Sequence, residues 1–268
     1  MTQKLPTFFI SHGGGPAFWI QWNPVDLFDK LKKSLEEVPA LVGSLPKSIL
    51  IISAHWEENE FTVQSTQNPS MIYDYQGFPP HTYQLQYNSP GSPVLAKRVV
   101  ELLEKDKIKV AVNYHRGYDH GAFVPLMVMY PLANIPVVQL SVKYGCDSEE
   151  HYKLGQSLSK LREEEVLIIG SGFSFHNLGH FSDPRGLSKG FDDWLNTSIT
   201  QKTGELRRKE LLNWQQAPGA KFCHPTPEHL IPLMVAAGAA ENEPGFRFYN
   251  EQMKKFQFWT SSFQFGKN

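Results

Sequence analysis

Four short runs of β-branched and other apolar residues, separated by longer stretches with helical periodicity, constrain the fold of this chain most strongly. The runs cover residues 7–10, 48–53, 137–142 and 166–170. Each is apolar at most positions, which is typical of strands buried on both faces of a sheet. A weaker run, residues 109–113, is predicted to pair beside them. The pattern predicts an α/β fold with a central mixed, largely parallel β-sheet flanked by helices.

Helical periodicity and capping residues predict five helices between these runs. The predicted helices cover residues 24–38, 92–105, 149–162, 190–212 and 227–240. Asn23, Ser92 and Thr226 each precede a proline and are residue types that cap a helix N-terminus.

Residues 69–93 are rich in proline and tyrosine and predict a long irregular loop. Loops of this length in α/β proteins often serve as lids or binding loops. No internal repeat and no linker divides the sequence, so we expect residues 1–268 to form a single catalytic domain.

Charge and cysteine content exclude several classes of function. The 26 basic and 27 acidic side chains nearly cancel, so the chain has no positive field to attract nucleic acid or an anionic membrane. It also lacks the roughly 20-residue apolar run of a membrane span and the pattern of a signal peptide. Cys146 and Cys223 are too few and too far apart for a disulfide framework or a thiolate metal site. We therefore expect a cytoplasmic monomer or small homo-oligomer that acts on a small molecule.

Four of the ten histidines follow predicted strands or open a predicted helix. His12 follows the first strand in SHGGGP, His55 follows the second in SAHW, and His176 follows the fourth in SGFSFHN. His229 lies in HPTPEH, in the expected first turn of the last helix. Ligand sites of open α/β sheets form where the carboxyl ends of strands converge, so these imidazoles are candidates for a metal site.

Each of these histidines also has a simpler interpretation when it is taken alone. The glycines after His12 could cradle a phosphate, but they lack the Lys-Ser/Thr of a P-loop and the dinucleotide-binding spacing. His55 alone would more often be structural, and His229 alone would be a surface residue beside a helix cap. Their similar placement is what favours a metal site.

His120 lies in a further glycine-flanked loop, and the preceding Asp119 indicates either an orienting carboxylate or a simple turn. His151 begins a predicted helix, and we expect it to be solvated. The sequence lacks the nucleophile elbow of a hydrolase and the HExxH helix of a zinc protease. The remaining interpretation is a mononuclear metal held by histidines, either in a zinc hydrolase or in a non-haem iron enzyme that binds a bidentate substrate and dioxygen.

A set of motifs in fixed order carries a resemblance to a known family. Between residues 6 and 238 the chain contains SHGGGPAFW, ISAHW, YDYQGFP, PGSP, GYDHGAFVPL, PVVQLSV, SGFSFHNL and HPTPEHLIPLM. Together they resemble the class III extradiol ring-cleavage dioxygenases, in particular the 4,5-DOPA extradiol dioxygenase branch. The resemblance implies a single α/β domain that opens a catechol ring beside its diol, with dioxygen, at a mononuclear metal.

The resemblance also implies roles for five histidines. His12, His55 and His229 match metal ligands. His176 matches a general base or an additional metal ligand, and a neutral imidazole there would remove a phenolic proton. His120 matches a second active-site histidine that protonates a departing oxygen as the ring opens.

Two further expectations concern the role of the aromatic residues in the loop and the identity of the metal. Tyr73, Tyr75 and Phe78 are predicted to pack against an aromatic substrate, although they could equally form the core of the loop. Iron enzymes of this kind usually combine two histidines with a carboxylate, whereas the matching residues here are all histidines, which suits Zn²⁺ as well as Fe²⁺. Glu228 and Glu57 are the nearest candidate carboxylates, and the pattern places neither of them well.

The first hypothesis for function is therefore a dioxygenase that acts on a small aromatic diol, such as DOPA, together with O2. A non-enzymatic metal-binding or interaction protein on the same scaffold and a zinc-dependent hydrolase are the alternatives. Tight zinc binding without oxygen uptake would favour the non-enzymatic metal-binding protein. Turnover of an ester or amide without oxygen would favour the zinc-dependent hydrolase.

Overall fold

The computed structural model describes residues 4–180, 182–183 and 185–266 and contains eight strands in that part of the chain. The strands are β1 (Thr7–Ser11), β2 (Ser48–Glu58), β3 (Phe61–Gln64), β4 (Val110–Asn113), β5 (Val137–Lys143), β6 (Val166–Gly172), β7 (Gly245–Gln252) and β8 (Trp259–Phe265).

The α-helices of the described residues are α1 (Asp29–Glu36), α2 (Val38–Val42), α3 (Pro93–Lys105), α4 (His120–Met129), α5 (Ser148–Leu158), α6 (Leu187–Thr200), α7 (Gly204–Leu212), α8 (Ala220–Cys223) and α9 (Pro232–Ala239). Short 3₁₀ helices connect several of these elements. No described helix is long and apolar enough to cross a membrane.

The strands form one mixed sheet in the order β4-β3-β5-β2-β6-β1-β8-β7. The central strands β5, β2, β6 and β1 run parallel, and antiparallel pairs join β3 to β5, β8 to β1 and β7 to β8. The predicted fold class, a mixed and largely parallel sheet flanked by helices, is confirmed. Because β1, β2 and β6 are neighbours, the segments that follow them begin at the same edge of the sheet.

The central strands are apolar at successive positions because the sheet is covered on both faces. Phe8 and Ile10 of β1 belong to one buried cluster, and Phe9 belongs to the other. Side chains alternate between the faces of a strand, so each cluster receives every second residue. Full burial of each of these side chains contributes roughly 1.5–3 kcal/mol.

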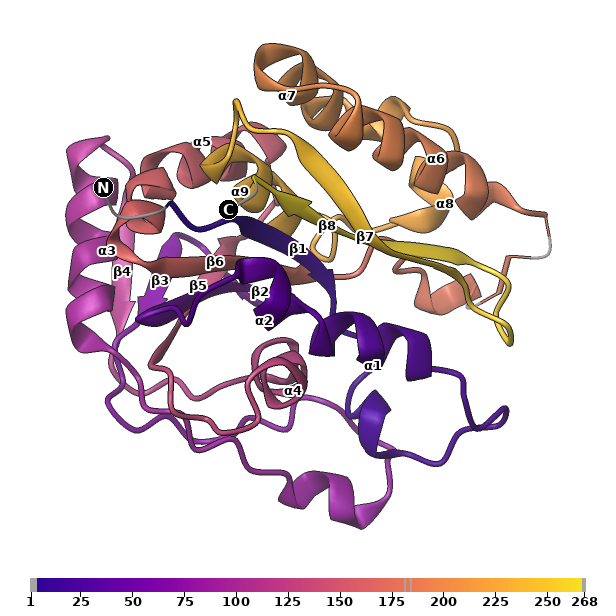
Figure 1. Ribbon diagram of the computed structural model, residues 1–268, viewed down its shortest axis with the longest axis horizontal. Coiled ribbons are helices and arrows are strands. Elements are labelled where there is room, and N and C mark those ends of the chain that lie inside the picture. The colour runs from indigo at the N-terminus through magenta and orange to yellow at the C-terminus, as the bar shows by residue number, and fades with distance from the viewer. Residues whose placement is uncertain (1–3, 181, 184, 267–268) are drawn as a thin grey trace.

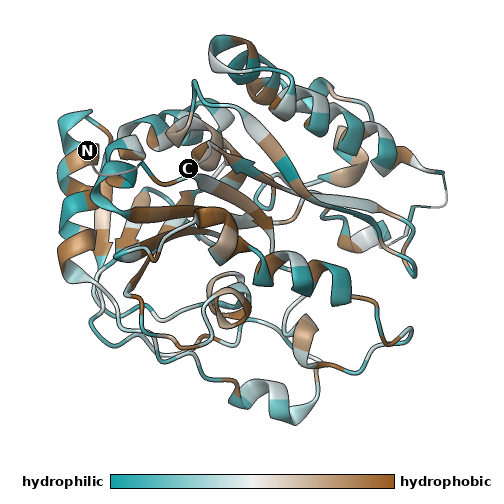
Figure 2. Ribbon diagram, viewed as in Figure 1, coloured by the Kyte–Doolittle hydropathy of each residue, from teal (hydrophilic) through white to brown (hydrophobic). Residues whose placement is uncertain are grey.

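Helices cover both faces of this sheet (Figure 1). Figure 1 shows α2 and α4 on one side and α5 and α9 on the other, while α6 and α7 lie beside the antiparallel strands β7 and β8. The hydropathy colouring places the most hydrophobic segments in the central strands and the hydrophilic ones on the outer helices (Figure 2). The sheet edge beyond β1, β2 and β6 is therefore held by a core on each side.

The five predicted strands are present, but the run at residues 109–113 lies at the edge of the sheet. It forms β4, which pairs with β3 and not with the four central strands. The sequence analysis missed β3, β7 and β8. Strand β8 contains two buried serines and one buried threonine, and these form hydrogen bonds within the protein: Ser262 Oγ, for example, accepts a hydrogen bond of 2.9 Å from the backbone N–H of Ser11.

The predicted helix at residues 92–105 is confirmed as α3, with the side chain of Ser92 accepting from the backbone N–H of Leu95. The helix predicted over residues 24–38 begins only at Asp29, because residues 25–28 form a turn that buries Leu27 and Phe28. Asn23 therefore caps no helix. The helix predicted over residues 149–162 is α5, which ends at Leu158 and continues as a 3₁₀ helix.

Two further helix predictions were too long. The stretch at residues 190–212 is divided into α6 and α7, and the N–H of Gly204 donates to the carbonyl of Glu241 where a continuous helix would run. The stretch at residues 227–240 becomes helical only at Pro232, because Thr226 Oγ1 donates to the Glu228 carboxylate and residues 228–231 form a turn. His229 lies in this turn and not in the first turn of α9.

Helix α4 was not predicted, because it is apolar on every side and contains Pro125. Its N-cap is Asp119, whose carboxylate accepts from the N–H of Ala122 at 3.2 Å and from Ser53 Oγ at 2.7 Å. Asp119 was predicted to be either an orienting carboxylate or part of a simple turn, whereas in the structure it is the N-cap of α4. The cap places His120 at the first position of α4.

The expectation that His151 is solvated was wrong. Its side chain is fully buried at the start of α5. Its Nδ1 lies 2.6 Å from the carbonyl of Asp147, and its Nε2 accepts a hydrogen bond of 3.0 Å from the N–H of Lys143. The ring also packs edge-on against Phe61. Helical periodicity did not reveal this burial, because the partners come from two neighbouring strands.

The buried neutral imidazole of His151 predicts a pH-dependent stability. Burial lowers its pKa to about 4, whereas an unfolded chain has a histidine pKa near about 6.5. Between these pH values the unfolded chain binds the additional proton, so stability falls as the pH falls. Urea unfolding should show that the wild type loses up to about 3 kcal/mol more than His151→Gln between pH 6.5 and 4.

The matched control is His115→Gln, which changes an exposed histidine. Its stability should follow the wild-type pH profile. Equal losses of unfolding free energy in the wild type and in His151→Gln would contradict this account of His151.

Candidate active site

Three neighbouring parallel strands bring histidines to one edge of the sheet. His12 directly follows β1, and His55 lies in β2 just beyond Ser53, where the pairing of β2 with β5 shifts register. The third, His229, is held against the end of β6, because the N–H of Phe173 donates to its carbonyl oxygen at 3.0 Å. A Cβ atom on Gly172 would lie 2.0 Å from that oxygen, so this approach requires glycine.

The Nε2 atoms of these three histidines converge. His55 Nε2 lies 3.2 Å from His12 Nε2 and 3.1 Å from His229 Nε2. The His12 and His229 side chains are buried, and that of His55 is about one-fifth exposed. The structure thus brings together three histidines from distant parts of the chain with the same ring nitrogen facing the same point.

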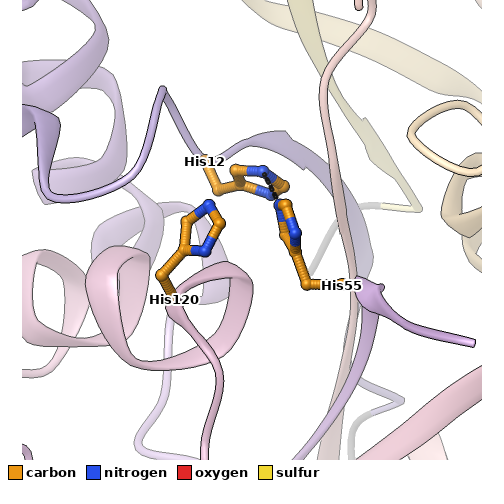
Figure 3. Close-up of side chains that lie close together, drawn as sticks. All are labelled: His12, His55 and His120. Carbon is orange, nitrogen blue, oxygen red and sulfur yellow. Dashed lines mark hydrogen bonds between the residues drawn. The ribbon is translucent and has the colours of Figure 1, made fainter. Parts of the chain in front are cut away.

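His120 lies on one flank of this group. The rings of His12, His55 and His120 face one another in Figure 3, and the His55 and His120 ring centroids are 3.8 Å apart. Asp74 Oδ1 accepts from Nδ1 of His120 at 2.8 Å and from its backbone N–H at 2.9 Å. Asp74 Oδ2 lies 3.5 Å from Nδ1 of His55. His12, His55 and His120 are close enough together to hold a metal ion.

His176 lies on the other flank. Its ring stacks on that of His229, with centroids 3.4 Å apart and an angle of 15° between the planes. Glu228 Oε1 lies 3.0 Å from Nδ1 of His229 and 3.2 Å from Nδ1 of His176. His176, Glu228 and His229 form a second group that could hold a metal ion.

The environment keeps the converging imidazoles neutral. Burial, together with the neighbouring imidazoles, holds the pKa of His12 and of His55 well below the usual range. Burial also lowers the pKa of His229 to about 4, although Glu228 opposes this change. A neutral imidazole is the form that binds a transition metal.

Burial has the opposite effect on the two carboxylates, whose pKa it would raise. Hydrogen bonds from His176 and His229 outweigh burial and lower the pKa of Glu228. The hydrogen bond from His120 does the same for the pKa of Asp74. Both carboxylates are therefore ionised acceptors beside the cluster.

A hydrogen-bond chain fixes the proton on His12. Ser171 Oγ donates its own hydrogen to the carbonyl oxygen of Gly121 and lies 3.0 Å from Nδ1 of His12. Nδ1 must then carry the proton and donate it to Ser171, which leaves a lone pair on Nε2. Nδ1 of His229 likewise donates to Glu228, so the Nε2 atoms of both histidines present lone pairs toward His55.

The histidines form the polar end of a cavity of about 470 Å³. The opposite wall is aromatic and comes from distant segments; it comprises Trp22, Phe28, Phe78, Phe173, Phe256 and Phe258. The glycines that follow His12 and the exposed side chain of Leu178 complete the lining together with Asp74. A polar, metal-capable end and an apolar wall are suited to a flat aromatic ligand with polar groups on one edge.

The three aromatic residues that were predicted to contact the substrate, Tyr73, Tyr75 and Phe78, do not all lie at the cavity. Phe78 lines the cavity, whereas Tyr73 and Tyr75 are not among the described lining residues. Tyr73 donates its hydroxyl to the carbonyl of Leu85, and Tyr75 donates to that of Thr82. Their rings pack edge-on within the loop, and Tyr75 also contacts the His120 ring. The placement of Tyr73 and Tyr75 favours the loop-core interpretation, and of the three aromatic residues only Phe78 is among the described residues that line the cavity.

The sequence analysis missed Asp74, Ser171 and the part of the aromatic wall contributed by residues 256 and 258. Asp74 lies between Tyr73 and Tyr75 in the motif YDYQGFP, whose aromatic residues alone had been predicted to belong to the site. Phe256 and Phe258 lie between β7 and β8, a hairpin that had not been predicted. Glu228 had been noted, but nothing in the sequence indicated that it contacts two imidazoles.

Comparisons with known proteins agree with this geometry. A family model described as the catalytic LigB subunit of aromatic ring-opening dioxygenase matches residues 6–263. The chain is 43% identical over 254 residues to a 4,5-DOPA dioxygenase extradiol from Beta vulgaris, covering 91% of this chain and 90% of that protein. It is 40% identical to a protein of the same name from Mirabilis jalapa, covering 89% and 88% of the two chains.

A solved structure has the same fold. The crystal structure of uncharacterized protein JW3007 from Escherichia coli K12 superposes with a TM-score of 0.79 at 28% identity. The match covers 98% of this chain and 100% of that chain. The arrangement of strands described above therefore extends to an experimentally determined structure.

The glycine turn after His12 gives a testable feature of the cavity wall. Gly15 has a φ of +54°, and a Cβ atom there would lie 2.9 Å from the ring of Phe78. Gly15→Ala should lower the free energy of unfolding by about 1–2 kcal/mol, because it combines a left-handed backbone with this clash. Gly14→Ala is the matched control, since no atom lies within 4 Å of its added Cβ. Equal stabilities of the two variants in urea unfolding would contradict the role given to Gly15.

Proposed function

The chain belongs to the family of catalytic LigB subunits of aromatic ring-opening dioxygenases, and we propose that it opens the ring of a DOPA-like catechol at one histidine-bound metal. Both atoms of dioxygen enter the product as the ring carbon–carbon bond beside the diol breaks. No external reductant is therefore required. The proposal treats residues 1–268 as one catalytic domain, acting in the cytoplasm as a monomer or small homo-oligomer.

The observation that carries the proposal is the close approach of two unprotonated Nε2 atoms, those of His12 and His229, to Nε2 of His55. Those of His12 and His229 bear lone pairs, because their Nδ1 atoms hold the protons. His55 Nε2 can carry at most one hydrogen, which could bridge only one of its two contacts, at 3.2 and 3.1 Å. The other contact is then left without a hydrogen bond, and if His55 Nε2 carries no hydrogen both contacts join lone pairs. A cation among the nitrogens would satisfy these lone pairs in either case.

The spacing also fits a metal. Zinc–nitrogen bonds of about 2.0–2.1 Å in tetrahedral geometry place ligand nitrogens roughly 3.3–3.4 Å apart. The two Nε2 separations at His55 are slightly shorter than this. His12, His55 and His229 are therefore the proposed ligands.

His176 is better suited to proton transfer than to a fourth ligand position. Its ring is nearly parallel to that of His229 and 3.4 Å from it. An imidazole lone pair lies in the plane of its ring, so two stacked and nearly parallel rings direct their lone pairs along separate lines and would not both hold one ion. This geometry supports His176 as the general base of the two roles expected for it.

The bound metal would act as a Lewis acid that binds both catechol oxygens and lowers the pKa of the phenol. Either Zn²⁺ or Fe²⁺ fits three neutral imidazoles. We propose Fe²⁺ for the active enzyme, because Zn²⁺ does not change oxidation state and dioxygen chemistry requires a redox-active centre.

The protein's own groups would orient the substrate and move its protons. The diol edge of the catechol would face the histidines, and its ring would pack against Phe78 and the rest of the aromatic wall. His176, held by Glu228, would accept a phenolic proton at Nε2. His120, held by Asp74 on the opposite flank, would accept the second phenolic proton at Nε2 and return it to an oxygen as the ring opens.

The ligand assignment predicts a specific pattern of metal loss. His12→Ala, His55→Ala and His229→Ala should each weaken Zn²⁺ binding by more than about 100-fold, since loss of a group that only orients a ligand already costs 10- to 100-fold. His176→Ala should retain binding within a few-fold. Competition with a chromogenic chelator measures these affinities, and His115→Ala serves as the exposed control. Loss of binding in His176→Ala, with retention in His229→Ala, would contradict the assignment.

Turnover provides the direct test of the activity. Protein loaded with Fe²⁺ should consume oxygen in the presence of DOPA or simpler catechols and generate a ring-opened chromophore. His176→Ala and His120→Ala should each lower kcat by about 100- to 10,000-fold, because each removes a proton-transfer group. An absence of turnover on every catechol, with iron shown to be bound, would reject the dioxygenase proposal. Hydrolysis of esters or amides without oxygen would favour the zinc hydrolase instead.

A further inference from the structure

We propose that Asp74 and Glu228 are paired positioning residues, each of which holds one metal-ligand histidine and one proton-transfer histidine through their Nδ1 atoms. The inference rests on the proposed function for the roles of the four histidines. In this proposal both carboxylates orient histidine rings and neither binds the metal. It also explains why four imidazoles, those of His55, His120, His176 and His229, all turn Nδ1 toward a carboxylate.

Asp74 serves the flank that contains His120. Its Oδ1 accepts from both Nδ1 and the backbone N–H of His120, at 2.8 and 2.9 Å. Two hydrogen bonds to one residue fix the side chain of His120 relative to the start of α4. The second oxygen, Oδ2, lies 3.5 Å from Nδ1 of His55. Asp74 therefore spans a proposed ligand and a proposed proton-transfer group.

Glu228 repeats this arrangement on the other flank. A single oxygen, Oε1, lies 3.0 Å from Nδ1 of His229 and 3.2 Å from Nδ1 of His176. The two rings stack because they share this acceptor. A carboxylate from a different segment of the chain thus makes the same kind of pair, one proposed ligand with one proposed proton-transfer group.

The shared consequence is a fixed tautomer. An ionised carboxylate can only accept, so an Nδ1 atom within hydrogen-bond distance of it carries the proton. The lone pair then resides on Nε2, which is the atom available to a metal or to a substrate proton. For the fifth histidine, His12, Ser171 and the carbonyl of Gly121 produce the same result without a carboxylate.

The same geometry disfavours Glu228 as a metal ligand. His176, Glu228 and His229 lie close enough together to be considered a metal site. However, Oε1 is hydrogen-bonded to Nδ1 of His229 and lies 3.2 Å from Nδ1 of His176, and an ion on that oxygen would compete with both contacts. We therefore infer that Glu228 orients a ligand and does not bind the metal.

Nitrogen-15 NMR of the metal-free wild-type protein tests the tautomers without any substitution. His120, His176 and His229 should each show a protonated Nδ1 and an unprotonated Nε2. His55, whose contact with Asp74 is longer, should show the same form as the major species. An Nε2-protonated form of His120 or His176 would overturn the proposal.

Two variants test whether each carboxylate acts on its own pair. In Asp74→Asn the 15N signals of His120 and His55 should change, with those of His176 and His229 preserved. In Glu228→Gln the pattern should be reversed. Each variant should weaken Zn²⁺ binding by about 10- to 100-fold, as expected when a group that orients a ligand is lost.

The matched control is Glu57→Gln. Glu57 is an exposed carboxylate two residues beyond His55 on β2, and its Oε1 accepts a hydrogen bond of 3.5 Å from the thiol of Cys146. It should keep wild-type tautomers and Zn²⁺ affinity. Zn²⁺ affinities of Asp74→Asn and Glu228→Gln within twofold of this control, in variants shown by circular dichroism to be folded, would overturn the proposal. If either variant fails to fold, the histidine tautomers of the wild-type protein still test the positioning proposal.

These readouts separate the present inference from the proposed function. Tautomers and Zn²⁺ affinities that follow the predicted pattern, in a protein that turns over no catechol, would support the positioning role and reject the dioxygenase. Ring cleavage by a wild type with the opposite tautomers would support the dioxygenase and reject the positioning role.

Discussion

The close approach of the Nε2 atoms of His12 and His229 to Nε2 of His55, at 3.2 and 3.1 Å, is the interaction on which the rest of this structure depends. Buried, neutral nitrogens that direct lone pairs at one another repel, so the surrounding protein must hold them in place. In our proposal a metal ion converts this repulsion into three bonds. The fold supplies the rigid frame, the hydrogen-bond acceptors supply the orientation, and aromatic side chains supply the apolar part of the cavity lining.

The frame is the parallel centre of the sheet. Strands β1, β2 and β6 are adjacent and buried on both faces, so their carboxyl ends have little freedom to move. His12 and His55 come from two of these ends. His229 reaches the third through the close approach of its carbonyl oxygen to Gly172. A cavity lined by apolar rings beside this frame leaves the histidines as its polar end, which is the arrangement that an aromatic diol requires.

The central strands and part of the histidine cluster could be predicted from the sequence, because the patterns that reveal them are local. The central strands are continuous apolar runs, and His12 and His55 follow two of them directly, so both the sheet edge and two members of the cluster were evident. Tyr73 and Tyr75, on either side of Asp74, were likewise identified from a local motif. The resemblance to ring-cleaving enzymes then linked these local patterns to a chemistry that spacing alone could not identify.

The remaining features depend on contacts between distant segments. Nothing local indicates that Asp74 meets His120, since 46 positions separate them. His151 was expected at the surface because its buried partners lie on neighbouring strands. The wall residues Phe256 and Phe258 lie in a hairpin whose second strand has buried, hydrogen-bonded serines in place of an apolar run.

The position of the metal is the central claim, and anomalous diffraction from a crystal of the metal-loaded protein measures it most directly. The account predicts one anomalous peak per chain, about 2.0–2.2 Å from Nε2 of His12, His55 and His229. A peak bound by His120 in place of His229, or one bound by the Glu228 carboxylate together with His176, would contradict it.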